Sequence, residues 1–225
     1  MYEFVTGPLA WIAFTIFFIG LIWRFIWYIR GLDWQMDRVS YGRNVGYGVK
    51  GAARSIMRWL IPFGTHGWRF YPVFTVLVFV FHLCLLITPL FLKGHNMLLD
   101  ERWGVSLPTL PEALADTMTV AVMVAAVLIF MRRMALPEVR ILTKAYDIVL
   151  ILIAVAPFFT GFMAFHQIGD YKLWLILHIV CGEIMLVAIP LTKLSHFLLF
   201  FLSRAQLGMD FGVKRGGMKS AGMPW

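Results

Sequence analysis

Five long runs of apolar residues constrain this chain more than any other feature of its sequence. A helix needs about 20 mostly apolar residues to cross the hydrocarbon core of a bilayer, and each run reaches or approaches that length. The runs are residues 8–29, 70–92, 115–131, 146–165 and 173–202. The last is longer than a bilayer is thick, so we expect it to tilt or to extend into water. The sequence predicts an all-α integral membrane bundle of five transmembrane helices, which forms a single membrane domain over residues 1–225.

The composition supports lipid rather than water as the surroundings of this chain. Hydrophobic residues make up 60% of the sequence and charged residues 14%, whereas soluble domains average about 25% charged residues. Lipid surroundings accept this apolar surface, provided that the backbone forms its hydrogen bonds within helices. The first run follows no basic segment and no convincing cleavage site, so we expect a retained helix rather than a removed signal peptide.

Basic residues gather in alternate connections between the apolar runs. They concentrate in the loop 30–69, in the turn after the third run and in the tail 203–225. The positive-inside rule places these segments in the cytoplasm, which puts the N-terminus outside and the C-terminus inside. The net charge of +8 then reflects topology and contact with anionic lipid headgroups rather than nucleic acid. Within the loop, residues 52–60 could form an amphipathic surface helix or a platform for a soluble subunit.

Four of the six histidines lie within or beside the apolar runs. A polar side chain is costly there and usually has a structural or functional role. His178 and His196 are separated by 18 residues, which is five whole turns of a continuous helix, with a rise of about 27 Å. By the predicted topology, His82 can face His178 near the outer membrane face, and His66 can face His196 near the inner face. Two facing pairs at two depths are what bis-histidine ligation of two haems requires.

The histidines also allow other interpretations. An unbroken helix would turn His66 about 160° away from His82. The prolines and glycines that flank His66 predict irregular backbone, from which its ring could still reach the interface. An intramembrane histidine can also serve only as an interhelical hydrogen-bonding residue.

Other polar residues near the membrane have candidate roles. Arg24, Arg69 and Lys193 could bind haem propionates at the inner face, or could extend to the interface without any ligand. Glu183 could carry protons or pair with a basic neighbour. Cys84 and Cys181 are too few for a disulfide framework or a four-cysteine metal site, so we interpret them as small core residues.

Two tracts give the chain a resemblance to a known family. The tract FHLCLLITP, residues 81–89, and the 18-residue separation of His178 and His196 resemble the gamma-type cytochrome b subunit of respiratory nitrate reductase. The resemblance implies that His82 and His178 ligate an outer haem b and that His196 ligates an inner one. Where that family has its other helix-two ligand, this chain has Pro72. His66 must then replace that ligand, or the inner haem is differently ligated or absent.

Two further tracts are similar to relatives from sulfate-reducing bacteria. The tracts LPTLPEALAD, residues 107–116, and HGWR, residues 66–69, look like the cytochrome b subunits of transmembrane redox complexes of the Hmc, Tmc and Dsr types. This resemblance implies a menaquinone or menaquinol site near the outer haem. The residues it makes candidates for that site are His82, Lys93, His95, Arg102 and His166.

The function implied is that of a di-haem cytochrome b subunit in a membrane-bound respiratory complex of the bacterial cytoplasmic membrane. It would pass electrons between the menaquinone pool and partner subunits: cytoplasmic iron–sulfur subunits, an exterior multihaem cytochrome c and other membrane subunits. The alternative is a haem-free or single-haem anchor or assembly subunit. A transporter with a histidine proton relay is a third possibility, disfavoured because paired broken helices and inverted repeats are absent from the sequence.

Overall fold

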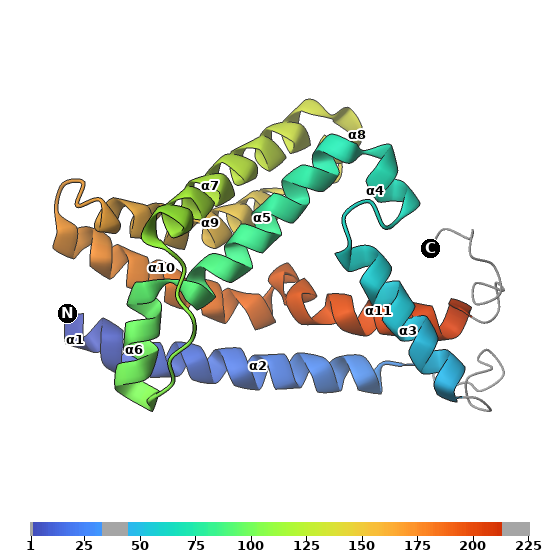
Figure 1. Cartoon of the computed structure of the whole chain (residues 1–225), viewed down its shortest axis with the longest axis horizontal. Helices are drawn as coiled ribbons and strands as arrows, with labels where there is room; N and C mark the ends of the chain where they lie inside the picture. Colours follow the sequence, from blue (N-terminus) through green and yellow to red (C-terminus); the bar gives the residue numbers. More distant parts are fainter. Residues whose placement is uncertain (1, 33–44, 213–225) are drawn as a thin grey trace. The chain divides into compact units, whose positions relative to one another are not determined.

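The computed structural model describes residues 2–32 and 45–212, and every regular element within them is a helix (Figure 1). Five of the described helices are long and apolar enough to cross a membrane: Tyr2–Arg30, Pro72–Phe91, Glu112–Ala135, Ala145–Phe165 and Tyr171–Leu191. The prediction of an all-α chain with five transmembrane helices is confirmed. The sides of the membrane on which the termini lie stay a prediction.

The chain divides into two compact units. Unit 1 comprises residues 1–13 and 76–186, and unit 2 comprises residues 14–75 and 187–225. The prediction of a single membrane domain is not tested by this division and stays a prediction.

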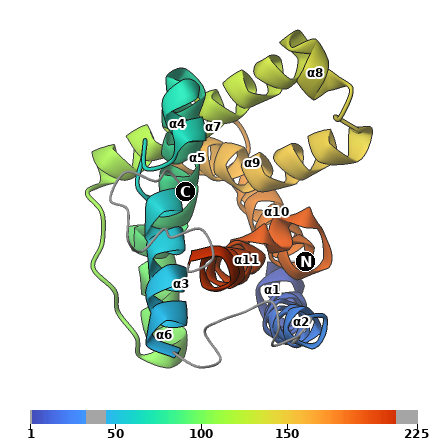
Figure 2. The same ribbon diagram turned by 90° about the vertical axis from the view of Figure 1, so that its right-hand side faces the viewer.

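In unit 1, α7 (Glu112–Ala135) packs against α9 (Ala145–Phe165) (Figure 2). A short helix, α8 (Pro137–Arg140), connects them. Buried alanines on both helices let the two backbones approach closely, as small residues do at membrane helix interfaces. Val122 of α7 is fully buried and belongs to one hydrophobic cluster with Phe158 of α9.

A further helix of unit 1, α6 (Lys93–Trp103), follows α5 (Pro72–Phe91) in a stretch where no helix was predicted. It ends at Gly104, which has φ +64° and donates its N–H to the Asp100 carbonyl, a common helix terminator. The ring of Trp103 packs edge-on against Trp11, with 6.2 Å between ring centroids. The contact between Trp103 and Trp11 therefore holds α6 against the first membrane helix.

The first membrane helix begins irregularly, and few of its side chains are buried. It comprises α1 (Tyr2–Phe4), the π-helical turn η1 (Val5–Leu9) and α2 (Ala10–Arg30). The wide turn contains Pro8, which lacks a backbone N–H and whose ring disfavours a regular α-helix interior. Only Ala13 of α2 is buried, while large side chains such as Trp23 and Phe18 are exposed. So much exposed apolar surface on one helix is typical of contact with lipid or with another membrane subunit.

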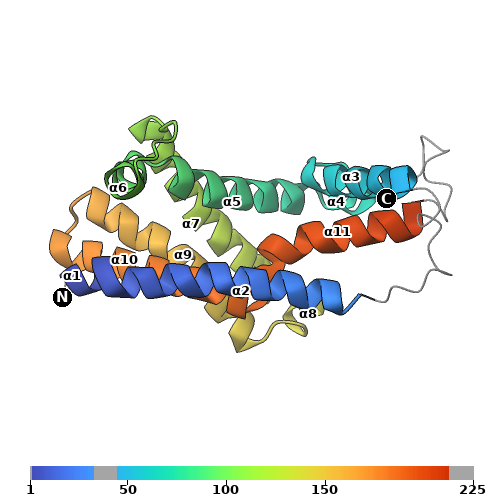
Figure 3. The ribbon, with the colours of Figure 1, turned by 90° about the horizontal axis from the view of Figure 1, so that it is seen from below.

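In unit 2, α3 (Val45–Leu60) and α11 (His196–Gly212) lie side by side (Figure 3). The predicted amphipathic segment 52–60 forms the second half of α3. The two backbones approach most closely at Gly51 and Gly208, where a Cβ atom on either residue would overlap the carbonyl oxygen of the other. Between α3 and α5 the chain turns and forms only the short helix α4 (His66–Phe70), which agrees with the predicted irregular backbone around His66.

The continuous helix predicted over residues 173–202 is wrong. Instead, α10 (Tyr171–Leu191) ends, a 3₁₀ turn η4 (Lys193–Ser195) follows, and α11 begins at His196. Pro190 lacks the N–H that a continuing helix needs, and the Thr192 hydroxyl accepts a hydrogen bond from Leu194 N, which favours a new helical start. Because the helix is broken, the five-turn spacing no longer places His178 and His196 on one face.

Gly51→Ala should lower the stability of the α3–α11 pair by about 1–3 kcal/mol, because the added methyl group meets backbone rather than a movable side chain. Hydrogen exchange of the α3 and α11 amides in detergent would measure this loss. Gly67→Ala is the matched control in unit 2, since a Cβ there meets nothing within 4 Å. Equal exchange in the two variants would contradict the close approach.

Candidate functional site

The histidines divide between the two units. His82, His95 and His178 belong to unit 1, whereas His66 and His196 belong to unit 2, so each predicted pair falls within one unit. Within the described residues, no three His, Cys, Asp or Glu side chains gather where they could hold a metal ion. A haem site differs from such a centre, because two histidines suffice when the macrocycle supplies the other four ligands.

The side chain of His178 in α10 is held by residues of the neighbouring helix α9. Its Nδ1 lies 2.8 Å from the carbonyl oxygen of Pro157 in α9. A carbonyl oxygen can only accept a hydrogen bond, so Nδ1 must carry a proton, and in the neutral ring the lone pair is on Nε2. A Cβ at Gly161 would lie 2.9 Å from both Cε1 and Nδ1 of this ring. Pro157 and Gly161, one turn apart on α9, thus form a cradle for His178, and sequence reasoning found neither residue.

His95 of α6 lies beside this cradle. The centroids of the His95 and His178 rings are 5.8 Å apart, and the ring planes are inclined by only 16°. His95 Nδ1 lies 2.8 Å from the carbonyl oxygen of Pro89, one of the last carbonyls of α5. That carbonyl has no donor within its own helix, because α5 ends at Phe91. His95 therefore caps α5, and its Nε2 is the ring nitrogen with the lone pair.

His82 of α5 is half-buried and bonds within its own helix. Its Nδ1 lies 2.8 Å from the carbonyl oxygen of Val78, one turn earlier. The adjacent Phe81 ring stands edge-on to it, with 5.3 Å between centroids. The structure thus places the ring of His95 against that of His178, and the pairing of His82 with His178 through a haem stays a prediction.

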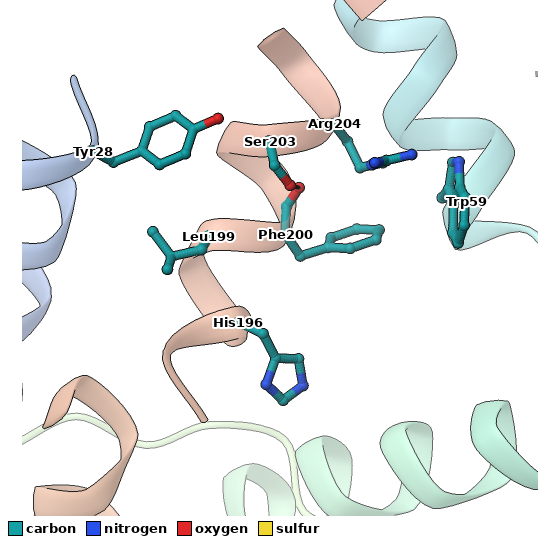
Figure 4. A pocket seen from close by; sticks show the side chains of 7 residues that line it. All are labelled: Tyr28, Trp59, His196, Leu199, Phe200, Ser203 and Arg204. Carbon is teal, nitrogen blue, oxygen red and sulfur yellow. Dashed lines mark hydrogen bonds between the residues drawn. The ribbon is translucent and has the colours of Figure 1, made fainter. Parts of the chain in front are cut away.

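His196 borders a cavity of about 330 Å³ in unit 2 (Figure 4). Its Nδ1 lies 3.0 Å from the Lys193 carbonyl oxygen, the same arrangement as in the other three rings. The guanidinium of Arg204 lies 4.6 Å from the ring centroid of Trp59, which suits a cation–π contact. The wall is mostly aromatic and apolar, and consists of Tyr28, Trp59, His196, Leu199, Phe200, Ser203 and Arg204. Except for His196, sequence reasoning did not single out these residues.

His66 is exposed and is the first residue of α4. The Thr65 hydroxyl accepts a hydrogen bond from Trp68 N and so caps this short helix. The His66 ring stacks against Phe70, with 6.2 Å between centroids. The ligand role of His66 stays a prediction.

Two of the three predicted propionate-binding cations, Arg24 and Arg69, donate to backbone carbonyls through their side chains. Arg24 Nε donates to the Pro190 carbonyl oxygen at 2.6 Å, which satisfies one of the last carbonyls of α10. Arg69 Nε donates to the Phe63 carbonyl at 3.0 Å, where Phe63 has φ +61°. Lys193 begins the 3₁₀ turn, and its own carbonyl accepts from His196. Each arginine has five N–H groups, so one such bond leaves others for a ligand.

Three of the predicted quinone-binding residues contact other parts of the chain. Lys93 Nζ lies 3.6 Å from a carboxylate oxygen of Glu112, and both side chains are exposed. Arg102 Nη2 donates to the Thr6 carbonyl at 2.8 Å. His166 Nε2 lies 2.9 Å from Asp116 Oδ1. These contacts join loops and helix ends, and they do not by themselves form a quinone site.

Glu183 of α10 is buried, and within the described residues neither of its carboxyl oxygens has a hydrogen-bond partner. A buried, unpaired carboxyl group is costly in apolar surroundings. Of the two roles considered from the sequence, pairing with a basic neighbour is not seen in the described part of the chain. Proton transfer by Glu183 stays a prediction.

A comparison with known proteins finds one close relative. A protein from Nitratidesulfovibrio vulgaris (strain Hildenborough) is 52% identical to this chain over 226 residues, an alignment that covers all of both chains. No protein-family model and no solved structure matches the chain.

Arg24→Gln should destabilise the α2–α10 contact by about 1.5–3 kcal/mol, since it removes a charged donor from a helix-end carbonyl. The midpoint of thermal unfolding in detergent would report the loss. Arg30→Gln is the control, because Arg30 lies on the same helix but is exposed at its end. Equal midpoints for the two variants would show that the Arg24 bond contributes nothing to stability.

Proposed function

We propose that this chain, which belongs to the same family as the Nitratidesulfovibrio vulgaris protein, is a di-haem cytochrome b subunit of a membrane-bound respiratory complex. It would pass electrons between the menaquinone pool and partner subunits across the bacterial cytoplasmic membrane. Bound haem supplies one-electron redox chemistry there, and the substrate chemistry of the complex belongs to other subunits.

The observation that carries the proposal is how the His178 ring is held by α9. Histidines that ligate metals almost always donate their other ring N–H to a carboxylate or a backbone carbonyl, which fixes both ring orientation and tautomer. His178 donates to the Pro157 carbonyl at 2.8 Å, and Gly161 leaves room for the ring. The same Nδ1 arrangement recurs at His82, His95 and His196.

The donor set of the chain fits haem b better than other metal centres. The described residues form no cluster of three His, Cys, Asp or Glu side chains, as zinc or a di-iron centre would need. Neutral imidazole Nε2 atoms in apolar surroundings are what bis-histidine haem ligation requires. His178 would hold the outer haem, and we expect its ring orientation to be set before haem binds.

The second haem would be held by His196 and His66 in unit 2. His196 adjoins an aromatic cavity, where Arg204 provides a positive charge near a wall of that cavity. Arg24 and Arg69 would compensate the propionate charges through donors that their backbone contacts do not use, and Lys193 would do so through its ammonium group. This site is less fully formed than that of His178, because both His66 and His196 are exposed.

Partner subunits would cover surfaces that this chain leaves exposed. The apolar side chains of α2 would face lipid or another membrane subunit, and the basic loop 30–69 would receive cytoplasmic iron–sulfur subunits. An exterior multihaem cytochrome c would dock at the opposite side. Menaquinone would react near the outer haem, close to Lys93, Arg102 and His166, with Glu183 as a proton carrier.

A pyridine haemochrome assay on purified complex tests the proposal. We expect two b haems per chain in the wild type and a loss of one in His178→Ala, because that ring would be an axial ligand. His166→Ala is the control, since this exposed histidine binds Asp116 and should leave the haem content unchanged. Absence of b haem from the wild-type chain would remove the proposal and favour a haem-free anchor or assembly subunit.

Gly161→Ala tests the cradle itself. The added methyl group must displace the His178 ring and weaken its bond to Pro157. Loss of such a supporting contact typically costs 10–100-fold in metal affinity, so haem should be lost during dialysis against an apo-protein acceptor. Gly182→Ala is the control, because a Cβ there meets nothing within 4 Å. Equal haem retention in both variants would show that the cradle does not support a ligand.

A further inference from the structure

We propose that α3 is an interfacial helix whose apolar face enters the surface of an anionic lipid leaflet, while its basic face stays in water. The sequence left two interpretations of this part of the chain open, a surface helix and a platform for a soluble subunit. Lipid contact by α3 needs no haem, so it is independent of the proposed function.

Two stripes of opposite character run along α3. Residues three or four apart lie on the same face of a helix. Lys50, Arg54 and Arg58 therefore form a basic stripe. The same spacing gives an apolar stripe, which consists of Val45, Val49, Ala53, Ile56 and Leu60. A helix with a basic face beside an apolar one is typical of segments that lie in a membrane surface.

The third face of α3 packs against α11 and leaves the apolar stripe outside the contact. Gly51 meets Gly208 there, and a Cβ at Gly208 would also lie 2.8 Å from Ser55 Cβ. On the apolar stripe, by contrast, Val45 is 63% exposed and Val49 is 56% exposed. Packing against α11 therefore fixes the helix without covering its apolar side chains, which need another apolar environment.

Contacts within unit 2 place α3 beside the end of the first membrane helix. The Tyr28 hydroxyl, in the last turn of α2, donates to Gln206 Oε1 of α11 at 2.5 Å. Two residues earlier in α11, the Arg204 guanidinium lies over the Trp59 ring of α3. Tyrosine and tryptophan gather where membrane helices leave the hydrocarbon core. These contacts favour a position for α3 at the level of the lipid headgroups.

The charge of α3 favours anionic lipid as the occupant of this surface. Its 16 residues include three basic residues and no acidic one. Phosphatidylglycerol and similar lipids attract such a helix, and the long stems of lysine and arginine let their charged ends reach the headgroups. A soluble subunit would have to bury the apolar stripe, whereas lipid accepts it directly. The basic stripe would remain accessible to the cytoplasmic subunit of the proposed function.

Spin labels on the full chain in lipid nanodiscs test the proposal. Val49→Cys places a label on the apolar stripe, and Lys50→Cys places the matched control label on the basic stripe. Both residues are exposed, so neither label should disturb the α3–α11 contact. Cys84→Ala and Cys181→Ala remove the native thiols.

In nanodiscs that contain phosphatidylglycerol, we expect oxygen, which dissolves in lipid, to relax the Val49 label more than a water-soluble nickel complex does. The label should lie about 5–10 Å into the boundary between headgroups and acyl chains. The Lys50 label should show the reverse preference. In phosphatidylcholine alone, the Val49 label should move toward water, because the electrostatic attraction is lost.

Three results would overturn the proposal. Preference for nickel at both positions would place α3 in water. Protection of the Val49 label from both reagents would mean that protein, such as a second copy of this chain, covers the stripe. Equal depth in the two lipids would remove the requirement for anionic lipid. None of these results bears on haem content, which the pyridine haemochrome assay measures separately.

Discussion

In a membrane interior, every backbone carbonyl that lacks a donor in its own helix must find one elsewhere, and much of this structure follows from that requirement. Pro89 and Pro190 lie close to the ends of α5 and α10, where the last carbonyls have no intrahelical donor. His95 supplies the donor at Pro89, and Arg24 supplies it at Pro190. Within α9, the Pro157 carbonyl accepts a further bond from His178. Helix ends and candidate site residues are therefore joined by the same hydrogen bonds.

These bonds couple the fold to the proposed chemistry. An imidazole that donates through Nδ1 to a carbonyl has its tautomer determined by the backbone, and its Nε2 is then suited to bind iron. A substitution that shifts a helix end would also rotate the histidine that caps it. His95 illustrates this coupling most directly, because the bond that ends α5 also presents its ring to His178.

The sequence predicted the helices better than it predicted the site. Long apolar runs indicated the five membrane helices, because hydropathy over about 20 residues is a strong and local signal. Hydropathy did not reveal the helix break after Leu191, because the apolar residues continue across it. Pro190 and Thr192 are nevertheless ordinary signs of a helix end and a new start. The helix α6 carries few apolar residues in a row, and only Gly104 marked its end. The cradle of Pro157 and Gly161 depends on how α9 meets α10, a tertiary contact that no spacing in the sequence indicates.

The two histidine sites differ in how completely this chain builds them. His178 is restrained by a carbonyl, a glycine surface and a neighbouring ring, all from unit 1. His66 and His196 are exposed, and the cavity beside His196 has only about 330 Å³, near the lower end of the range for small-molecule pockets. A ligand site needs side chains whose rotamers are held by surrounding groups. For unit 2 we therefore expect the proposed partner subunit on the predicted cytoplasmic side to cover these exposed histidines, whereas the surroundings of His178 are formed by this chain.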